Sequence, residues 1–105
     1  MKPYKIKIDG TEETLLPLDG KQFTEEELRA HVGGTPMVIC RKDMNVVVVN
    51  NDLYYDVTEN FPINEKASKD IYPFMIEEDV LEWVLGDAIV CAPYEIPKEM
   101  TQVKE

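Results

Sequence analysis

Two runs of β-branched residues constrain the fold of this chain more than any other feature. Pro36–Cys40 reads Pro-Met-Val-Ile-Cys and Asn45–Val49 reads Asn-Val-Val-Val-Val, with the polar loop Arg41–Met44 between them. β-Branched side chains favour strands, and apolar runs without polar interruption are typical of strands that are covered on both faces or central in a sheet. The two runs therefore predict neighbouring strands that are covered on both faces or central in the sheet.

A helix at Glu25–Val32 is predicted by the residues at its two ends. Thr24 can accept a hydrogen bond from the first amides of the helix, while Glu27 can reach back to the amide of Thr24. Gly33-Gly34 ends the helix, because glycine adopts the left-handed cap conformation without steric cost. Its packing residues are Leu28 and Val32. A helix this short is marginal alone, so we expect it to dock on the sheet.

Weaker patterns predict the remaining elements. Alternating apolar and polar residues indicate strands, and apolar residues at helical spacing after an acidic turn indicate helices. The further strands predicted are Tyr4–Ile8, Thr11–Leu18, Leu53–Val57 and Ala88–Ala92. The further helices are residues 65–70 and Ile76–Leu85. We expect Leu53–Val57 to follow the two valine-rich strands in a three-stranded antiparallel meander.

These elements predict a single α+β domain, with a mainly antiparallel sheet and two helical regions packed on it, at about 25–32 and 64–85. The 105 residues suffice for one modest core and not for two. We expect the domain to span residues 1–97, and residues 98–105 to form a flexible C-terminal tail.

The charge of the chain limits its partners. The sequence has 21 Asp and Glu against 11 Lys and Arg, for a formal net charge of -10. Nucleic acids and anionic membranes bind through Lys and Arg that displace counterions, so neither is an expected direct partner. A protein with a basic surface is the electrostatically favourable partner. The oligomeric state stays open.

The sequence predicts a cytoplasmic protein. Residues 1–8 lack the apolar core of a secretory signal, and the longest uninterrupted apolar run is Val46–Val49. A membrane-spanning helix takes about 20 apolar residues. Cys40 and Cys91 are too few for a disulfide framework and lie in apolar runs, which predicts two reduced, buried thiols.

Carboxylates are the candidate functional groups. They gather in two stretches, around Glu25–Glu27 and between residues 77 and 87. Such stretches are ordinarily solvated helix starts, but spaced carboxylates can also dock to a basic cleft, and an exposed tyrosine makes a good interface anchor. The candidate interaction residues are Glu25, Glu26, Glu77, Glu78, Asp79, Glu82, Asp87 and Tyr55.

No motif predicts catalysis, a metal site or a cofactor. His31 and the two distant cysteines lack the ligand spacing of a zinc site. Gly33-Gly34 is not followed by the Gly-Lys-Ser/Thr of a phosphate-binding loop. The Asp…Glu-x-Lys pattern of metal-dependent nucleases is also absent, since no Glu is followed two residues later by Lys.

Four segments carry a resemblance to a known family: Leu28–Gly34, Asn50–Leu53, Phe61–Ala67 and Leu85–Val90, which together span most of residues 15–92. In this order they resemble a family of small phage and mobile-element proteins, labelled domain of unknown function 3846. The acidic stretch before Gly86 departs from the family pattern. The resemblance implies an accessory protein of a phage or mobile element in bacterial cytoplasm, and it brings no known activity or catalytic residue.

Three functional hypotheses follow from these observations. The leading one is a non-enzymatic interaction protein that binds a basic protein surface, in one form as a DNA mimic against host defence enzymes. The second is a small-molecule or nucleotide-binding protein, with phosphate donors from Lys, Arg29, Arg41 or the amides near Gly33-Gly34. The third is a metal-dependent hydrolase that uses carboxylates between residues 77 and 87.

Overall fold

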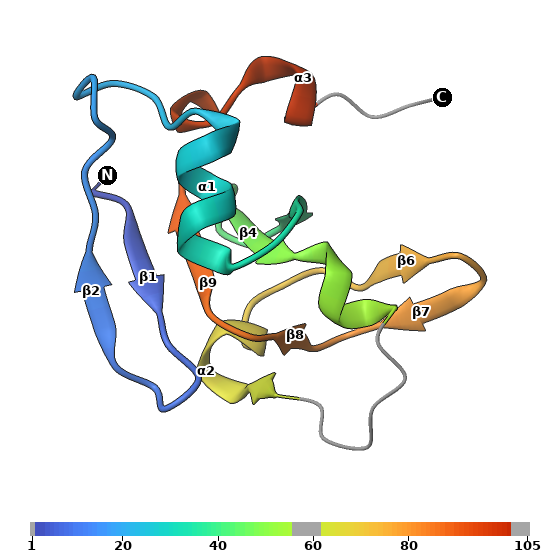
Figure 1. Cartoon of the computed structure of the whole chain (residues 1–105). Helices are drawn as coiled ribbons and strands as arrows, with labels where there is room; N and C mark the ends of the chain where they lie inside the picture. Colours follow the sequence, from blue (N-terminus) through green and yellow to red (C-terminus); the bar gives the residue numbers. More distant parts are fainter. Residues whose placement is uncertain (1, 56–61, 102–105) are drawn as a thin grey trace.

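The computed structural model describes residues 2–55 and 62–101, which form an α+β fold around a five-stranded antiparallel sheet (Figure 1). The strands are β1 (Tyr4–Ile6), β2 (Glu12–Thr14), β3 (Pro36–Cys40), β4 (Val46–Asn50) and β9 (Ala88–Cys91). Their order is β2-β1-β9-β4-β3, so the strand that comes last in the chain lies at the centre. This order confirms β3 and β4 as neighbours and β4 as an interior strand. The prediction of a covered or central position is wrong for β3, which is an edge strand and is only partly buried.

Helix α1 (Glu25–Val32) covers one face of the sheet (Figure 1). Leu28 and Val32 pack with Val46 and Val48 of β4 and with Ile89 of β9. The predicted capping box is present: the Thr24 Oγ1 accepts from the Glu27 N–H at 3.2 Å, and the Glu27 Oε2 accepts from the Thr24 N–H at 2.6 Å. Hydrogen bonds from the amides of Thr24 and Leu18 hold the pKa of Glu27 below its usual value.

Short elements cover the opposite face of the sheet. They are β5 (Ile63–Asn64), α2 (Glu65–Ser68), β6 (Phe74–Ile76), β7 (Asp79–Leu81) and β8 (Val84–Leu85). Val47 and Val49 of β4 and Val90 of β9 face this layer and pack with Ala67 and Val84. Alternate residues of β4 enter two hydrophobic clusters, one on each face of the sheet, so every residue of this strand is buried, as its unbroken apolar run predicts. The sheet thus divides the expected single core into two clusters.

The predicted helix at Ile76–Leu85 is wrong. Residues 74–81 form the β6–β7 hairpin, in which Ile76 pairs with Asp79 across a two-residue turn, Glu77-Glu78. Glu77 has a φ of 56°, in the left-handed region, which ends the extended run and reverses the chain. The helical spacing of the apolar residues here is coincidental, because the same residues also alternate between the two faces of a hairpin. Of the second helical region predicted at 64–85, only the short helix α2 is therefore present.

The predicted strand at Leu53–Val57 is also wrong over its described part. Residues Asn51–Tyr54 form the 3₁₀ helix η1, in which the Asn50 Oδ1 accepts from the Asp52 N–H at 3.0 Å. This side-chain cap turns the chain away from the sheet, and β9 takes the place beside β4 that the meander assigned to residues 53–57. Residues 56 and 57 lie outside the described residues.

The predicted C-terminal tail begins with regular structure. The 3₁₀ helix η2 (Pro93–Glu95) is followed by helix α3 (Lys98–Thr101), and Met100 packs against the core under α1. Residues 102–105 of the predicted tail lie outside the described residues. At the other end, only Glu12–Thr14 of the predicted strand at 11–18 pairs with β1.

The two cysteines differ in exposure. Cys91 is buried, and burial raises the pKa of its thiol to about 12. Cys40 is exposed, contrary to the prediction of two buried thiols, because it ends β3 at the sheet edge. In the parts of the chain that the structure describes, no helix is long and apolar enough to span a membrane.

Candidate functional site

Most carboxylates outside the β6–β7 hairpin are engaged by the protein itself. One group accepts hydrogen bonds from backbone N–H groups in turns and caps: Asp9, Asp19, Glu27, Asp43, Asp52, Asp87 and Glu95. A second group forms ion pairs at the surface: Glu12, Glu13 and Glu25. These carboxylates are accounted for by the fold.

The carboxylates of the hairpin region are not engaged in this way. Glu77 and Glu78 form the hairpin turn, Asp79 begins β7, and Glu82 follows β7. All four side chains are exposed, and none forms a hydrogen bond or ion pair with another described residue. We call these four residues the hairpin carboxylates. Their charge faces solvent and is available to a partner.

The structure does not bring the two predicted acidic stretches together. Glu25 and Glu26 are exposed in the first turn of α1, and Glu25 pairs with Arg29 at 3.8 Å. The β6–β7 hairpin extends away from α1 on the side of the molecule opposite β1 and β2 (Figure 1). Asp87 differs from the hairpin carboxylates in its role, because its Oδ1 accepts from the Ile8 N–H at 3.1 Å.

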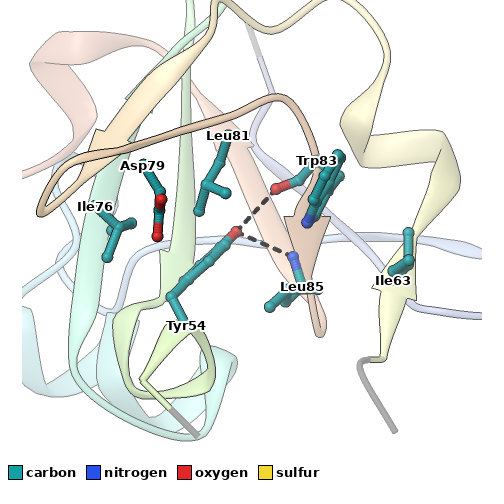
Figure 2. Close-up of a pocket in the computed structure, with 7 residues that line it drawn as sticks. All are labelled: Tyr54, Ile63, Ile76, Asp79, Leu81, Trp83 and Leu85. Atoms are coloured by element: carbon teal, nitrogen blue, oxygen red, sulfur yellow. Dashed lines mark hydrogen bonds between the residues drawn. The ribbon is translucent and has the colours of Figure 1, made fainter. Parts of the chain in front are cut away.

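A pocket of about 260 Å³ lies beside the hairpin carboxylates. Its lining residues are Tyr54, Ile63, Ile76, Asp79, Leu81, Trp83 and Leu85 (Figure 2). We call it the hairpin pocket. Its walls are mostly apolar, and Asp79 belongs both to the pocket wall and to the hairpin carboxylates.

The pairing of short strands explains how these residues converge. Ile76 and Asp79 are directly opposite in the β6–β7 register, and Leu81 points to the same face two residues further on. Ile63 is paired with Leu85 across β5 and β8. The pocket therefore combines residues of two small sheets, β5–β8 and β6–β7, whose strands are not hydrogen-bonded to each other.

Tyr54 holds the wall of the pocket in place. Its hydroxyl accepts from the Leu85 N–H at 3.0 Å and donates to the Trp83 carbonyl oxygen at 3.2 Å, and its ring reaches between the Asp79 and Trp83 sides of the pocket (Figure 2). The ring also packs edge-on against Phe74 at 5.5 Å. Burial raises the pKa of Tyr54 to about 12, so the hydroxyl keeps its proton at physiological pH.

We expect Tyr54→Phe to lower the free energy of unfolding by about 1–2 kcal/mol, because the Leu85 N–H and the Trp83 carbonyl lose a partly buried partner. Chemical denaturation measures this change, and the emission of Trp83, the one tryptophan of the chain, should shift with it. Tyr55→Phe is the matched control. Tyr55 is 52% exposed, so equal effects of the two substitutions would contradict the role of the Tyr54 hydroxyl.

Tyr55, the predicted aromatic anchor, is exposed as expected, although it follows a 3₁₀ helix and does not lie on a strand. It does not line the hairpin pocket. The aromatic residues that do so, Tyr54 and Trp83, are not among the site residues predicted from the sequence. Tyr54 comes from η1 and Trp83 follows β7, and no local pattern in the sequence indicates that the fold brings these two residues to one wall.

Two observations bear on the alternative functions, a metal-dependent hydrolase and a nucleotide-binding protein. Among the described residues, no group of three or more His, Cys, Asp or Glu side chains is placed to hold a metal ion. Near Gly33-Gly34, the Gly33 N–H donates to the Arg29 carbonyl and the Thr35 N–H donates to the Asp52 carboxylate at 3.1 Å. These amides are therefore engaged and not available to a phosphate.

Comparisons with protein-family models, with curated proteins and with solved structures find no match to this chain. The resemblance to domain of unknown function 3846 stays a prediction from the sequence. The hairpin carboxylates and the pocket beside them are therefore the basis for a functional proposal.

Proposed function

We propose that this protein is a non-enzymatic interaction protein that binds a basic protein surface through the hairpin carboxylates. The observation that carries the proposal is the clustering of acidic residues that the fold does not engage. Many acidic residues are engaged in caps, turns and ion pairs, and Glu26, Glu65, Asp70 and Glu99 are exposed without such a partner at separate places in the chain. Glu77, Glu78, Asp79 and Glu82, in contrast, lie exposed and without a described partner close together, in or directly after one hairpin.

Physical chemistry favours a basic partner at such a surface. Like charges that lie close together repel one another, and a complementary basic surface relieves this repulsion and speeds association. A mimic of duplex DNA needs carboxylates spread along an elongated surface, whereas these four are confined to one hairpin. The proposal therefore names a basic protein surface and not a DNA-binding cleft. Phage or mobile-element origin and a cytoplasmic location remain predictions from the sequence.

Affinity capture from a bacterial lysate at two ionic strengths tests the proposal. We expect the retained partner to be lost at high salt, and to be lost at low salt from the variant Glu77→Gln, Glu78→Gln, Glu82→Gln. Exposed ion pairs contribute about 0.2–1 kcal/mol each, so the triple substitution should weaken binding by roughly 3- to 100-fold.

The matched control is Glu26→Gln, Glu65→Gln, Glu99→Gln, which removes the same number of charges outside the hairpin and includes one predicted residue of α1. We expect this control to bind nearly as the wild type. Capture that is insensitive to salt, or a control that weakens binding as much as the hairpin variant, would contradict the proposal.

A further inference from the structure

The hairpin pocket has a feature that carboxylates alone do not explain. Its lining is mostly apolar, yet Trp83 is 46% exposed and Ile63 is 47% exposed. Exposed aromatic and aliphatic side chains that converge on one hollow are typical of interface anchor sites, in which burial from water supplies most of the binding energy.

The size of the pocket limits its occupant. Pockets for small-molecule ligands and cofactors are typically about 300–1,000 Å³, whereas this one is about 260 Å³. It therefore suits a single large side chain. None of its seven lining residues carries a positive charge, so a phosphate group has no cationic partner there.

The negative charge around the pocket indicates which residues flank that side chain in the partner. Asp79 lies in the wall, and the other hairpin carboxylates lie on the same hairpin or directly after it. A segment that inserts an apolar side chain brings its flanking residues close to these carboxylates. Lys and Arg are the residues whose charge is complementary there.

We propose that the hairpin pocket binds one large apolar side chain, Phe or Leu, from a partner segment in which Lys or Arg flank that residue. This inference rests on the proposed function and specifies the motif that the basic partner presents. The apolar side chain replaces water against Trp83, Leu81 and Ile63, and the flanking cations pair with the hairpin carboxylates.

A second copy of the chain is a poorer occupant. Each copy carries a formal net charge of -10, and two hairpins brought together would place their unpaired carboxylates side by side. The outer face of the hairpin, with Met75 and Val80 exposed, points away from the pocket, because these residues alternate with those that line it.

Fluorescence of Trp83 tests the inference with three blocked peptides. The first is Gly-Lys-Arg-Phe-Lys-Arg-Gly, the second has Ala in place of Phe, and the third has Gln in place of every Lys and Arg. We expect the first peptide to change the Trp83 emission saturably and to bind at least tenfold more tightly than either of the others. Burial of a Phe side chain is sufficient for a ratio of about ten- to a hundredfold over Ala.

Two neighbouring residues of β7 supply the matched variants. Leu81→Ser removes part of the pocket wall and should abolish the preference for Phe over Ala, whereas Val80→Ser alters the opposite face and should retain it. Ile63→Ser, at a more exposed wall position, gives the same test if Leu81→Ser disturbs the hairpin. Circular dichroism checks that each variant is folded.

The outcomes separate this inference from the proposed function. Equal, salt-sensitive binding of the Phe and Ala peptides overturns the pocket assignment and leaves the basic-surface proposal intact. If the neutral Phe peptide binds as tightly as the basic one, the requirement for flanking Lys or Arg is refuted. No binding of any peptide at millimolar concentration overturns the pocket assignment, while lysate capture decides the proposed function separately. If the protein self-associates in the absence of peptide and Leu81→Ser abolishes this self-association, the pocket binds a second copy of the chain, and the inference is also overturned.

Discussion

Asn64→Ala is expected to lower the free energy of unfolding by about 3–5 kcal/mol. Asn64 is fully buried, and its side chain forms hydrogen bonds with three separate segments of the chain. Its Nδ2 donates to the Ile6 carbonyl oxygen at 2.8 Å and to the Gly86 carbonyl oxygen at 3.0 Å, and its Oδ1 accepts from the Ala67 N–H at 3.0 Å. Alanine leaves all three backbone groups without this partner, and each buried unsatisfied group costs about 1–3 kcal/mol.

Urea denaturation followed by circular dichroism measures this loss. It is a large fraction of the total stability of a small domain, which is about 5–15 kcal/mol. Asn51→Ala is the matched control, because the Asn51 side chain has no described hydrogen bond, and its effect should stay within about 0.5 kcal/mol. Asn64→Asp should be at least as harmful as Asn64→Ala at neutral pH, since a carboxylate cannot donate to the two carbonyl oxygens. A loss no larger than that of Asn51→Ala would refute the role of Asn64.

The elements that could be predicted from the sequence are those specified by neighbouring residues. Helix α1 is determined by Thr24, Glu27 and Gly33, whose capping interactions span fewer than ten residues. Strands β3 and β4 follow from their β-branched apolar runs, although only β4 is buried along its whole length. In both cases local preference and tertiary burial favour the same structure, and such agreement makes a prediction reliable.

The hairpin could not be predicted because its local pattern fits two structures. Ile76, Val80, Leu81 and Val84 match a helical period, and the acids before them resemble a helix start. The decisive residue is Glu77, whose left-handed φ makes the turn. Non-glycine residues rarely adopt this conformation, and a glutamate in the sequence does not indicate it.

The hydrogen-bond partners of the candidate site are also beyond sequence reasoning. The sequence places the four exposed acids of residues 77–82 among the candidates, but it places Asp87 and Glu25 there too, although the fold engages both. The pocket joins Tyr54, Ile63 and Trp83 through two small sheets. Pairing between segments so far apart in the chain depends on the whole fold and leaves no local signature.

Gly34→Ala is expected to destabilise the protein by about 2–4 kcal/mol through a steric conflict that reaches the candidate site. A Cβ atom at position 34 would lie 2.7 Å from Cγ of Asn50, a largely buried residue whose Oδ1 caps η1. Overpacking of this kind costs about 1–3 kcal/mol, and loss of the cap adds about 1 kcal/mol. Because η1 ends at Tyr54, we also expect the substitution to alter the emission of Trp83 and to weaken binding at the hairpin pocket.

A double-mutant cycle with Asn50→Ala isolates the cause. If the conflict between position 34 and the Asn50 side chain dominates, Gly34→Ala should cost less than about 1 kcal/mol once that side chain is truncated, so that the two substitutions are strongly coupled. Gly20→Ala provides the contrasting case: Gly20 has a φ of 76°, and a Cβ atom added there would meet no other atom within 4 Å, so its cost of about 1 kcal/mol reflects backbone strain alone. Additive effects of Gly34→Ala and Asn50→Ala would show that the destabilisation by Gly34→Ala arises from something other than the conflict with the Asn50 side chain.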